Sequence, residues 1–152
     1  MTEKDIESLM QEALREAEKS LEKGEVPVGC VITKEDGTIV GRGHNTPISS
    51  LDPTAHGEIN ALRDAARNRG NYRLPDCLAF VTLEPCPMCS GALVNSRIKR
   101  VYFGAGDPGG GGLVSLYGIG TDDRLNHRIE VVGGVLEERC QRLIRDFFSS
   151  RR

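Results

Sequence analysis

Four side chains in the middle of the sequence have the types and spacing of a hydrolytic metal centre. His56 and Glu58 are two residues apart, and Cys86 and Cys89 lie further along, three residues apart. One imidazole and two thiolates can hold a zinc ion with a fourth position open for water, which distinguishes a catalytic zinc from a structural one. Zinc lowers the pKa of bound water from about 15.7 to about 7, so hydroxide becomes available at neutral pH. The pattern predicts a catalytic zinc held by His56, Cys86 and Cys89.

Glu58 is the remaining member of the group, and we expect it to move protons rather than to bind the metal. Adding water to an aromatic ring carbon requires the water to lose a proton, and a ring nitrogen and the departing ammonia to gain protons. One carboxylate beside the metal can serve each step in turn. Its presence argues against a metal-containing scaffold that only binds a partner, because binding alone does not need a proton carrier.

Two simpler explanations of the cysteine pair stay open at this stage. A Cys-x-x-Cys pair can be redox-active, but a redox motif has no use for the upstream histidine and glutamate. The pair can also be half of a structural zinc site, which needs four ligands. The nearest further ligand candidates are Cys77, which lies in an apolar run of strand type, and His127, which is far along the chain.

Length and composition indicate one globular domain spanning residues 1–152. The chain has 38% hydrophobic and 28% charged residues, and its formal net charge of −2 neither indicates nor excludes a nucleic-acid partner. Its five cysteines, an odd number without a secretory leader, argue against a disulfide framework. No apolar run approaches the roughly 20 residues that span a membrane. We therefore expect a cytoplasmic protein without membrane segments, whose cysteines stay reduced and free for metal.

Hydrophobic periodicity predicts helices and strands that alternate after an opening hairpin. Helices are expected over residues 6–21, 52–68, 85–96 and 135–148, and strands over residues 28–33, 38–43, 78–83, 101–104 and 128–132. Asp36-Gly37 is a hairpin turn signal between the first two strands. This order predicts an α/β protein whose mixed sheet carries helices on both faces.

The metal centre imposes a condition on the second helix. Residues two apart in a regular helix point to nearly opposite sides, so His56 and Glu58 can share a site only if His56 lies at an irregular helix start. Cys86 and Cys89 share one helix face near an N-terminus, where the helix dipole favours thiolates. The two helix starts should meet at the carboxyl ends of the preceding strands, where open α/β sheets usually place their sites.

The His-x-Glu and Pro-Cys-x-x-Cys pattern resembles the zinc-dependent cytidine deaminase superfamily. The resemblance implies a cytidine-deaminase-like fold, a three-layer α/β/α arrangement with a mixed five-stranded sheet. It also implies one Zn²⁺ per subunit, held by His56, Cys86 and Cys89, with Glu58 as the catalytic proton shuttle.

Segments along almost the whole chain resemble the bacterial tRNA adenosine deaminases. The matching segments are residues 25–29, 45–48, 52–56, 71–74, 82–85, 96–98, 125–128, 146–148 and 151–152. The resemblance implies conversion of adenosine to inosine at the wobble position of tRNA. The implied partner is the tRNA anticodon arm, bound by a homodimer whose subunits share the RNA surface.

The same resemblance implies roles for further residues. Asn45 would hydrogen-bond the base, and Val28 and Glu84 would belong to the substrate-binding pocket. The last helix would supply RNA contacts from Arg145, Phe147, Phe148, Arg151 and Arg152. Residues 137–152 carry five arginines against three acidic residues, a modest basic excess that suits phosphate binding.

Two features differ from the tRNA enzymes. Gly57 stands between the metal ligand and the shuttle, where those enzymes usually have alanine, and together with residues 41–45 it resembles fungal-type cytosine deaminase. Residues 109–112 are all glycine in a loop that is usually less glycine-rich, and this loop lacks the Lys-Ser/Thr ending of a phosphate-binding loop. A free-base enzyme needs a closed pocket, whereas an RNA enzyme needs an open groove. Deamination of a free nucleobase or nucleoside, cytosine or guanine, is the alternative prediction.

Overall fold

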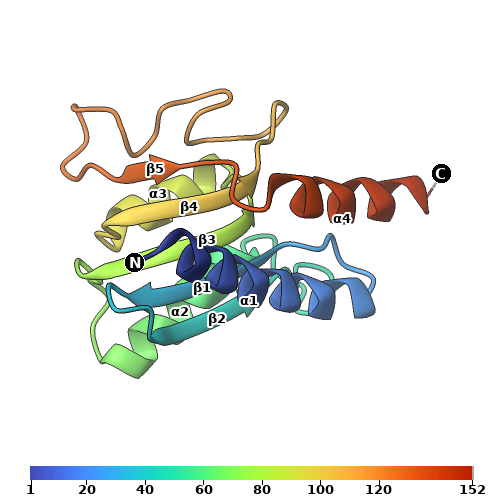
Figure 1. Ribbon diagram of the computed structural model, residues 1–152, viewed down its shortest axis with the longest axis horizontal. Helices are drawn as coiled ribbons and strands as arrows, with labels where there is room; N and C mark the ends of the chain where they lie inside the picture. Colours follow the sequence, from blue (N-terminus) through green and yellow to red (C-terminus); the bar gives the residue numbers. More distant parts are fainter. Residues whose placement is uncertain (152) are drawn as a thin grey trace.

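The helices and strands follow the order that the sequence predicts, in a computed structural model that describes residues 1–151 (Figure 1). The helices are α1 (Glu3–Glu22), α2 (Gly57–Arg69), α3 (Pro87–Asn95) and α4 (Glu137–Ser149). The strands are β1 (Gly29–Lys34), β2 (Ile39–His44), β3 (Cys77–Leu83), β4 (Arg100–Ala105) and β5 (Glu130–Val132).

The strands form one mixed sheet in the order β2-β1-β3-β4-β5. β1 is antiparallel to both β2 and β3, whereas β3, β4 and β5 are parallel to one another. Parallel neighbours need a crossover connection, and α3 provides it between β3 and β4. The carboxyl ends of parallel strands point to one edge, so the segments that follow β3 and β4 leave the sheet on the same side. The predicted mixed five-stranded sheet is confirmed.

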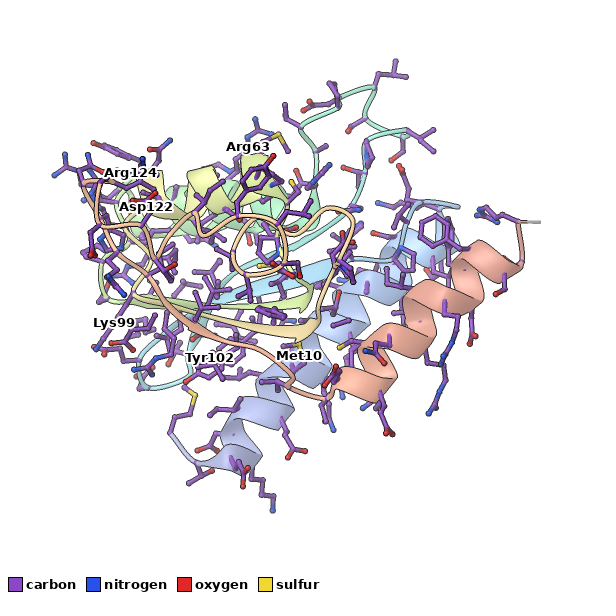
Figure 2. All side chains as sticks on the ribbon, turned by 90° about the horizontal axis from the view of Figure 1, so that it is seen from above. Met10, Arg63, Lys99, Tyr102, Asp122 and Arg124 are labelled. Atoms are coloured by element: carbon purple, nitrogen blue, oxygen red, sulfur yellow. The ribbon has the colours of Figure 1, made fainter. Side chains whose placement is uncertain are left out.

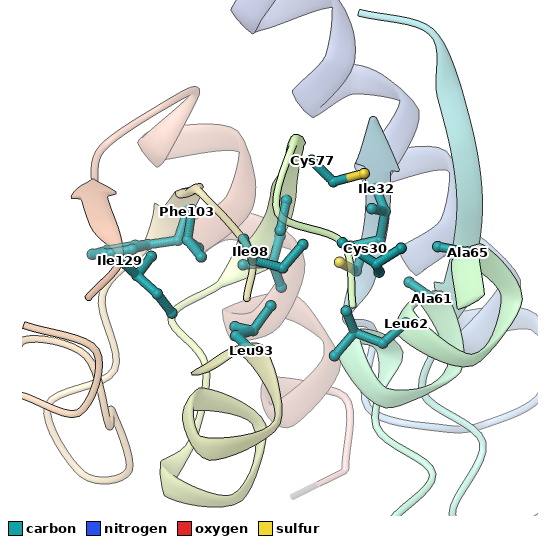
Figure 3. Packing of buried hydrophobic residues seen from close by; sticks show 14 of the residues in the cluster. Cys30, Ile32, Ala61, Leu62, Ala65, Cys77, Leu93, Ile98, Phe103 and Ile129 are labelled. Atoms are coloured by element: carbon teal, nitrogen blue, oxygen red, sulfur yellow. The ribbon is translucent and has the colours of Figure 1, made fainter. Parts of the chain in front are cut away.

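The sheet is covered on both faces, by α1 and α4 on one side and by α2 and α3 on the other (Figure 1 and Figure 2). Under α1, the rings of Phe80 and Tyr102 stack with their centroids 4.7 Å apart, beside Met10. The core under α2 and α3 is built from aliphatic, cysteine and aromatic side chains, among them Cys30, Ile32, Leu62, Leu93, Ile98 and Phe103 (Figure 3). The predicted three-layer α/β/α arrangement is confirmed.

Two glycines of β2 bring α2 unusually close to the sheet. A Cβ atom at Gly43 would lie 2.3 Å from the backbone nitrogen of Ala61, and one at Gly41 would lie 2.6 Å from the carbonyl oxygen of the same residue. Neither position has room for a side chain, so glycine is required by close packing rather than by backbone angle. This approach sets the first turn of α2 against the end of β2, which positions the residues at the helix start.

The second helix begins later than the sequence pattern indicates, at Gly57 rather than near Asp52. Asp52 Oδ1 accepts hydrogen bonds from the backbone N–H and the hydroxyl of Thr54, at 2.9 and 2.7 Å. Such a side-chain turn competes with helical hydrogen bonding and delays the helix. The last strand is also shorter than the predicted 128–132.

The third and fourth helices differ from prediction by two residues at their starts. α3 begins at Pro87 rather than Pro85, because Cys86 has extended backbone angles and precedes the helix. α4 begins at Glu137 because Leu136 has a φ of 51°, in the left-handed region that a right-handed helix cannot contain.

A candidate metal centre at the starts of two helices

The predicted metal ligands meet where α2 and α3 begin. His56 directly precedes α2 with φ −77° and ψ 157°, and Cys86 directly precedes α3 with φ −68° and ψ 173°. Because His56 is extended rather than helical, its side chain and that of Glu58 can face one site. The irregular helix start that the metal hypothesis requires is therefore present.

The three ligand atoms are spaced as a tetrahedral zinc site requires. His56 Nδ1 lies 3.6 Å from Cys86 Sγ and 3.5 Å from Cys89 Sγ. Zinc bonds of about 2.3 Å to sulfur and about 2.05 Å to nitrogen place such atoms about 3.6 Å apart in a tetrahedron. Among residues 1–151, these three form the one cluster of at least three potential ligands. A catalytic site with one open position fits this donor set.

The two residues considered as a fourth ligand make other contacts. Cys77 Sγ accepts a hydrogen bond from Arg69 Nη1 at 3.3 Å. His127 Nε2 lies 2.7 Å from the carbonyl oxygen of Ile98. Neither belongs to the metal cluster, so the structural-zinc alternative lacks its fourth ligand within residues 1–151.

The cysteine pair carries negative charge that suits a cation. A hydrogen bond from Cys89, together with one from His56, lowers the pKa of Cys86 to about 4. The same hydrogen bond with Cys86, reinforced by burial, raises the pKa of Cys89. The hydrogen bond to Cys86 also raises the pKa of His56. One thiolate is therefore present at neutral pH before a metal binds, at a helix N-terminus that stabilises it.

Glu58 lies beside the cluster, 3% exposed, in the first turn of α2. Its Oε1 atom is buried and has no hydrogen-bond partner among the described residues. Burial raises the pKa of Glu58 to about 7, because the charged carboxylate loses its hydration. A carboxyl group that gains and loses a proton near neutral pH is suited to general acid–base catalysis.

Glu58 and His56 open into a cavity of about 550 Å³, a volume typical of small-molecule sites. All three predicted substrate-binding residues, Val28, Asn45 and Glu84, line this cavity. Further lining residues for which the sequence predicted no individual role include Val26, Pro47, Leu83, Gly106, Gln141 and Ile144.

Asn45 is fixed by the start of α2. Its Oδ1 atom accepts a hydrogen bond from the backbone N–H of Gly57 at 2.6 Å, and its carbonyl oxygen accepts one from Ser20 at 2.8 Å. With the side-chain oxygen engaged, the Nδ2 amide hydrogens are the group that Asn45 can offer to a ligand in the cavity.

Glu84 is 2% exposed and already has several hydrogen-bond donors. It accepts from the backbone N–H groups of Asp107, Val114 and Ser115 at 3.1, 2.8 and 2.9 Å, and from the Ser115 hydroxyl. Burial alone would raise its pKa, but the hydrogen bonds from Ser115, Asp107 and Val114 lower it below the usual range. Glu84 therefore anchors the loop over residues 107–115 against the cavity.

A second buried carboxylate, Glu25, anchors a different loop, the one that contains Ile48 and Ser49. The sequence predicted no role for it. Glu25, 1% exposed, accepts hydrogen bonds from the N–H groups of Ile48 and Ser49 at 3.1 and 2.8 Å, and from the Ser49 hydroxyl at 2.8 Å. Its pKa is lowered because these hydrogen bonds outweigh the effect of burial. In the sequence, the signal for this anchoring role was a charged residue next to the apolar residues that lead into β1.

The predicted RNA-contact residues of α4 differ in exposure. Arg145 is exposed, and Phe148 is 49% exposed and lines the cavity. Phe147 is 5% exposed, packs edge-on against Phe148, and lies under the guanidinium of Arg151, 4.0 Å from its ring centroid. Its burial makes it a support for its neighbours rather than a surface group. Arg152 lies outside the described residues.

No helix within residues 1–151 combines the length and apolar character that crossing a bilayer requires.

Comparison with known proteins supports the assignment of the site. Residues 3–105 match the cytidine and deoxycytidylate deaminase zinc-binding region. A tRNA-specific adenosine deaminase of Streptococcus pyogenes serotype M1 is 52% identical over 139 residues, 91% of this chain and 81% of that protein.

Solved structures give the same family. One, from a study of A-to-I editing by tRNA:A34 deaminases at the wobble position of transfer RNA, superposes with a TM-score of 0.85 at 37% identity, covering 90% of this chain and 98% of that one. Guanine deaminase from Bacillus subtilis superposes with a TM-score of 0.62 at 39% identity, covering 66% of this chain and 64% of that one. The chain therefore belongs to the cytidine and deoxycytidylate deaminase family of zinc-dependent hydrolytic deaminases.

Proposed function

We propose that this protein converts adenosine to inosine at the wobble position of a tRNA anticodon. The observation that carries the proposal is the 52% identity to a tRNA-specific adenosine deaminase across 91% of the chain. The reaction is hydrolytic: a bond from water oxygen to the ring carbon forms, the bond from that carbon to the amino nitrogen breaks, and ammonia leaves.

His56, Cys86 and Cys89 would hold one Zn²⁺ per chain. When bound, the zinc supplies an acidified water at neutral pH. Glu58 would accept one proton from that water at a carboxylate oxygen and deliver it to the ring nitrogen. It would then accept the second proton of the water, from the hydroxyl group added to the ring carbon, and deliver it to the departing amino group. Its pKa of about 7 in the metal-free protein reflects a pocket that tolerates the protonated form of the shuttle.

The cavity walls would orient the flipped nucleotide. Asn45 would donate from Nδ2 to the base, and Val28 would pack against it. Glu84 would contribute indirectly, by holding in place the loop over residues 107–115. Because Phe148 is half-exposed at the cavity, its ring offers a face on which a nucleotide can stack.

The RNA surface would extend from the cavity along α4. Arg145, Arg151 and Arg152 would contact phosphates, while the buried Phe147 would hold Arg151 in place through their 4.0 Å stacking contact.

The same proposal includes a homodimer and a cytoplasmic location, where tRNA is found and cysteine ligands stay reduced. Exposed apolar side chains lie on α3 and on the loop that follows β4: Met88, Val114, Leu116 and Tyr117 are 38%, 62%, 52% and 57% exposed. Apolar surface of this kind marks protein–protein contacts, and a second copy of this chain is the proposed occupant. We take residues 1–152 as one deaminase domain.

One observation favours a second candidate, deamination of a free base. The Bacillus subtilis guanine deaminase aligns with 66% of this chain at 39% identity. The two candidates require different substrates for one reaction centre, so a paired assay separates them.

The paired assay measures ammonia release from a tRNA anticodon arm with adenosine at the wobble position, and from guanine, cytosine and adenosine as free compounds. The proposal predicts turnover of the RNA and inosine at that single position, with little ammonia from the free compounds. Rapid deamination of guanine or cytosine with unchanged RNA would overturn it in favour of the second candidate.

A further inference from the structure

A second cavity, distinct from the reaction cavity, lies at the edge of the sheet between α1 and α2. It has a volume of about 440 Å³ and is formed by α1, by the edge strand β2 and by α2. Its positively charged lining residues are Lys19, Lys23, Arg42 and Arg67, and its acidic ones are Glu16 and Asp64. We call this cavity the edge cleft. It is locally basic in a chain whose formal net charge is −2.

The edge cleft and the reaction cavity share one wall. Asn45 and Pro47 line the reaction cavity, whereas the alternate residues His44 and Thr46 line the edge cleft. This alternation is expected where the chain leaves β2 in an extended form, because successive side chains point to opposite sides. A single segment of backbone therefore separates the two cavities.

Two cations of the edge cleft have no acidic partner. Lys19 pairs with Glu16, and Arg42 pairs with Glu12. Lys23 and Arg67 are exposed and make no ion pair within residues 1–151. Their charge is available to an anion from outside the protein.

Lys23 is held in place by a hydrogen-bonded chain. Its Nζ atom donates to His44 Nε2 at 2.9 Å, and His44 Nδ1 donates to the buried Glu16 at 3.2 Å. An ammonium group that is already positioned loses less entropy when it binds an anion than a freely rotating one does.

The edge cleft also adjoins the proposed RNA surface of α4. Arg151 donates a hydrogen bond to the carbonyl oxygen of Gly24, the residue after Lys23, at 3.3 Å. Arg151 therefore places a positive charge from the end of α4 next to the turn that carries Lys23.

We propose that the edge cleft binds phosphate groups of the RNA strand adjoining the deaminated nucleotide, through Lys23 and Arg67. This inference rests on the proposed function, because it places a further part of the same RNA. When one base of an RNA strand enters the reaction cavity, only the shared wall separates that base from the edge cleft. The phosphates next to this nucleotide can then contact Lys23 and Arg67.

The test compares two double variants with equal loss of charge, Lys23→Gln/Arg67→Gln and the control Lys4→Gln/Arg124→Gln. Lys4 lies near the opposite end of α1, about 28 Å from Lys23 at 1.5 Å per helical residue. Arg124 lies in the loop before β5 (Figure 2). All proteins also carry Glu58→Gln, so that bound RNA is not converted, and each binds an anticodon stem-loop RNA over a series of salt concentrations.

We expect the cleft variant to weaken RNA binding about tenfold and to reduce the slope of log K against log salt by about 1.5, since two phosphate contacts are lost. The control should match the parent in both, and Lys23→Arg/Arg67→Lys, which keeps the charge, should restore the slope. A cleft variant that matches the control would overturn the inference while leaving the proposed function intact. If the parent does not bind the RNA, and the protein with Glu58 intact does not convert it, both the inference and the proposed function fall.

Discussion

Glu58 and Glu84 line the same cavity, are almost equally buried, and have opposite chemical environments. Glu58 has an oxygen without a hydrogen-bond partner and a pKa raised to about 7. Glu84 accepts hydrogen bonds from the backbone or hydroxyl groups of three residues of the neighbouring loop, and its pKa is lowered.

The contrast is the one expected between a carboxyl group that takes part in the reaction, as proposed for Glu58, and a carboxylate that anchors a loop, as Glu84 does. A carboxylate has about four lone-pair sites, so Glu84 has no acceptor capacity left for substrate, and its protonation would break the loop contacts. Protonation of Glu58 breaks no hydrogen bond of its buried Oε1 atom, because only solvent or substrate can pair with that oxygen. Pairs of acids whose surroundings push their pKa values apart are a recurrent sign of acid–base division in active sites.

The largest expected effect concerns Glu58. Glu58→Gln keeps the size of the side chain but removes its ability to carry a proton. We expect turnover to fall about 10³- to 10⁴-fold while the zinc content stays unchanged. Parallel measurement of deamination and bound metal checks this, and near-normal turnover would remove Glu58 from the proton-shuttle role.

The opposite pKa shifts also predict how stability depends on pH in the metal-free protein. Folding raises the pKa of Glu58 from 4.5 to about 7, so the folded state holds its proton more tightly than the unfolded state. Its contribution to stability is therefore fully present below pH 4.5 and is lost as the pH rises to about 7. The loss amounts to about 3 kcal/mol, at about 1.4 kcal/mol per pH unit.

Urea unfolding of the metal-free protein between pH 4 and 8 measures this loss, with metal-free Glu58→Gln as the control. The variant should become more stable than the parent as the pH rises through this range. Parallel pH profiles for the two proteins would contradict the raised pKa.

Glu84→Gln should have a smaller effect, and mainly on structure. The amide has one acceptor oxygen and turns its NH₂ group toward backbone donors, so at least one contact of the 107–115 loop is lost. We expect a loss of about 2 kcal/mol in the free energy of unfolding and a rise in KM that exceeds the fall in kcat. Unchanged stability with a large fall in kcat would instead place Glu84 in the chemical step.

The smallest expected effects come from the glycines of the same loop. A Cβ atom at Gly111 would lie 2.3 Å from the carboxyl carbon of Glu84, whereas one at Gly109 would have no atom nearer than 4.0 Å. Gly111→Ala should therefore destabilise the protein by about 1–2 kcal/mol, and Gly109→Ala should be nearly neutral. Thermal unfolding of both variants tests the assignment, and equal behaviour would argue against Glu84 as the anchor of this loop.

The sequence predicted those parts of the site that depend on short-range spacing. His56, Cys86 and Cys89 are candidate ligands whose residue types are informative in themselves. The requirement of an irregular start before α2 followed from the two-residue spacing of His56 and Glu58. The fold class followed from hydrophobic periodicity, because burial of each helix and strand leaves a repeating pattern.

What the sequence did not reveal depends on long-range hydrogen bonds. The roles of Glu25 and Glu84 as loop anchors come from partners more than twenty residues away along the chain. The late start of α2 came from the competing turn at Asp52, and that of α4 from the left-handed Leu136, neither of which changes the apolar periodicity.

The central claim is that one zinc, held by His56, Cys86 and Cys89, is required for deamination. The most direct measurement titrates zinc into metal-free protein and follows deamination of the tRNA anticodon arm. The account predicts no turnover without metal and a linear recovery that stops at one zinc per chain. Full activity in a preparation shown to be free of metal would contradict it.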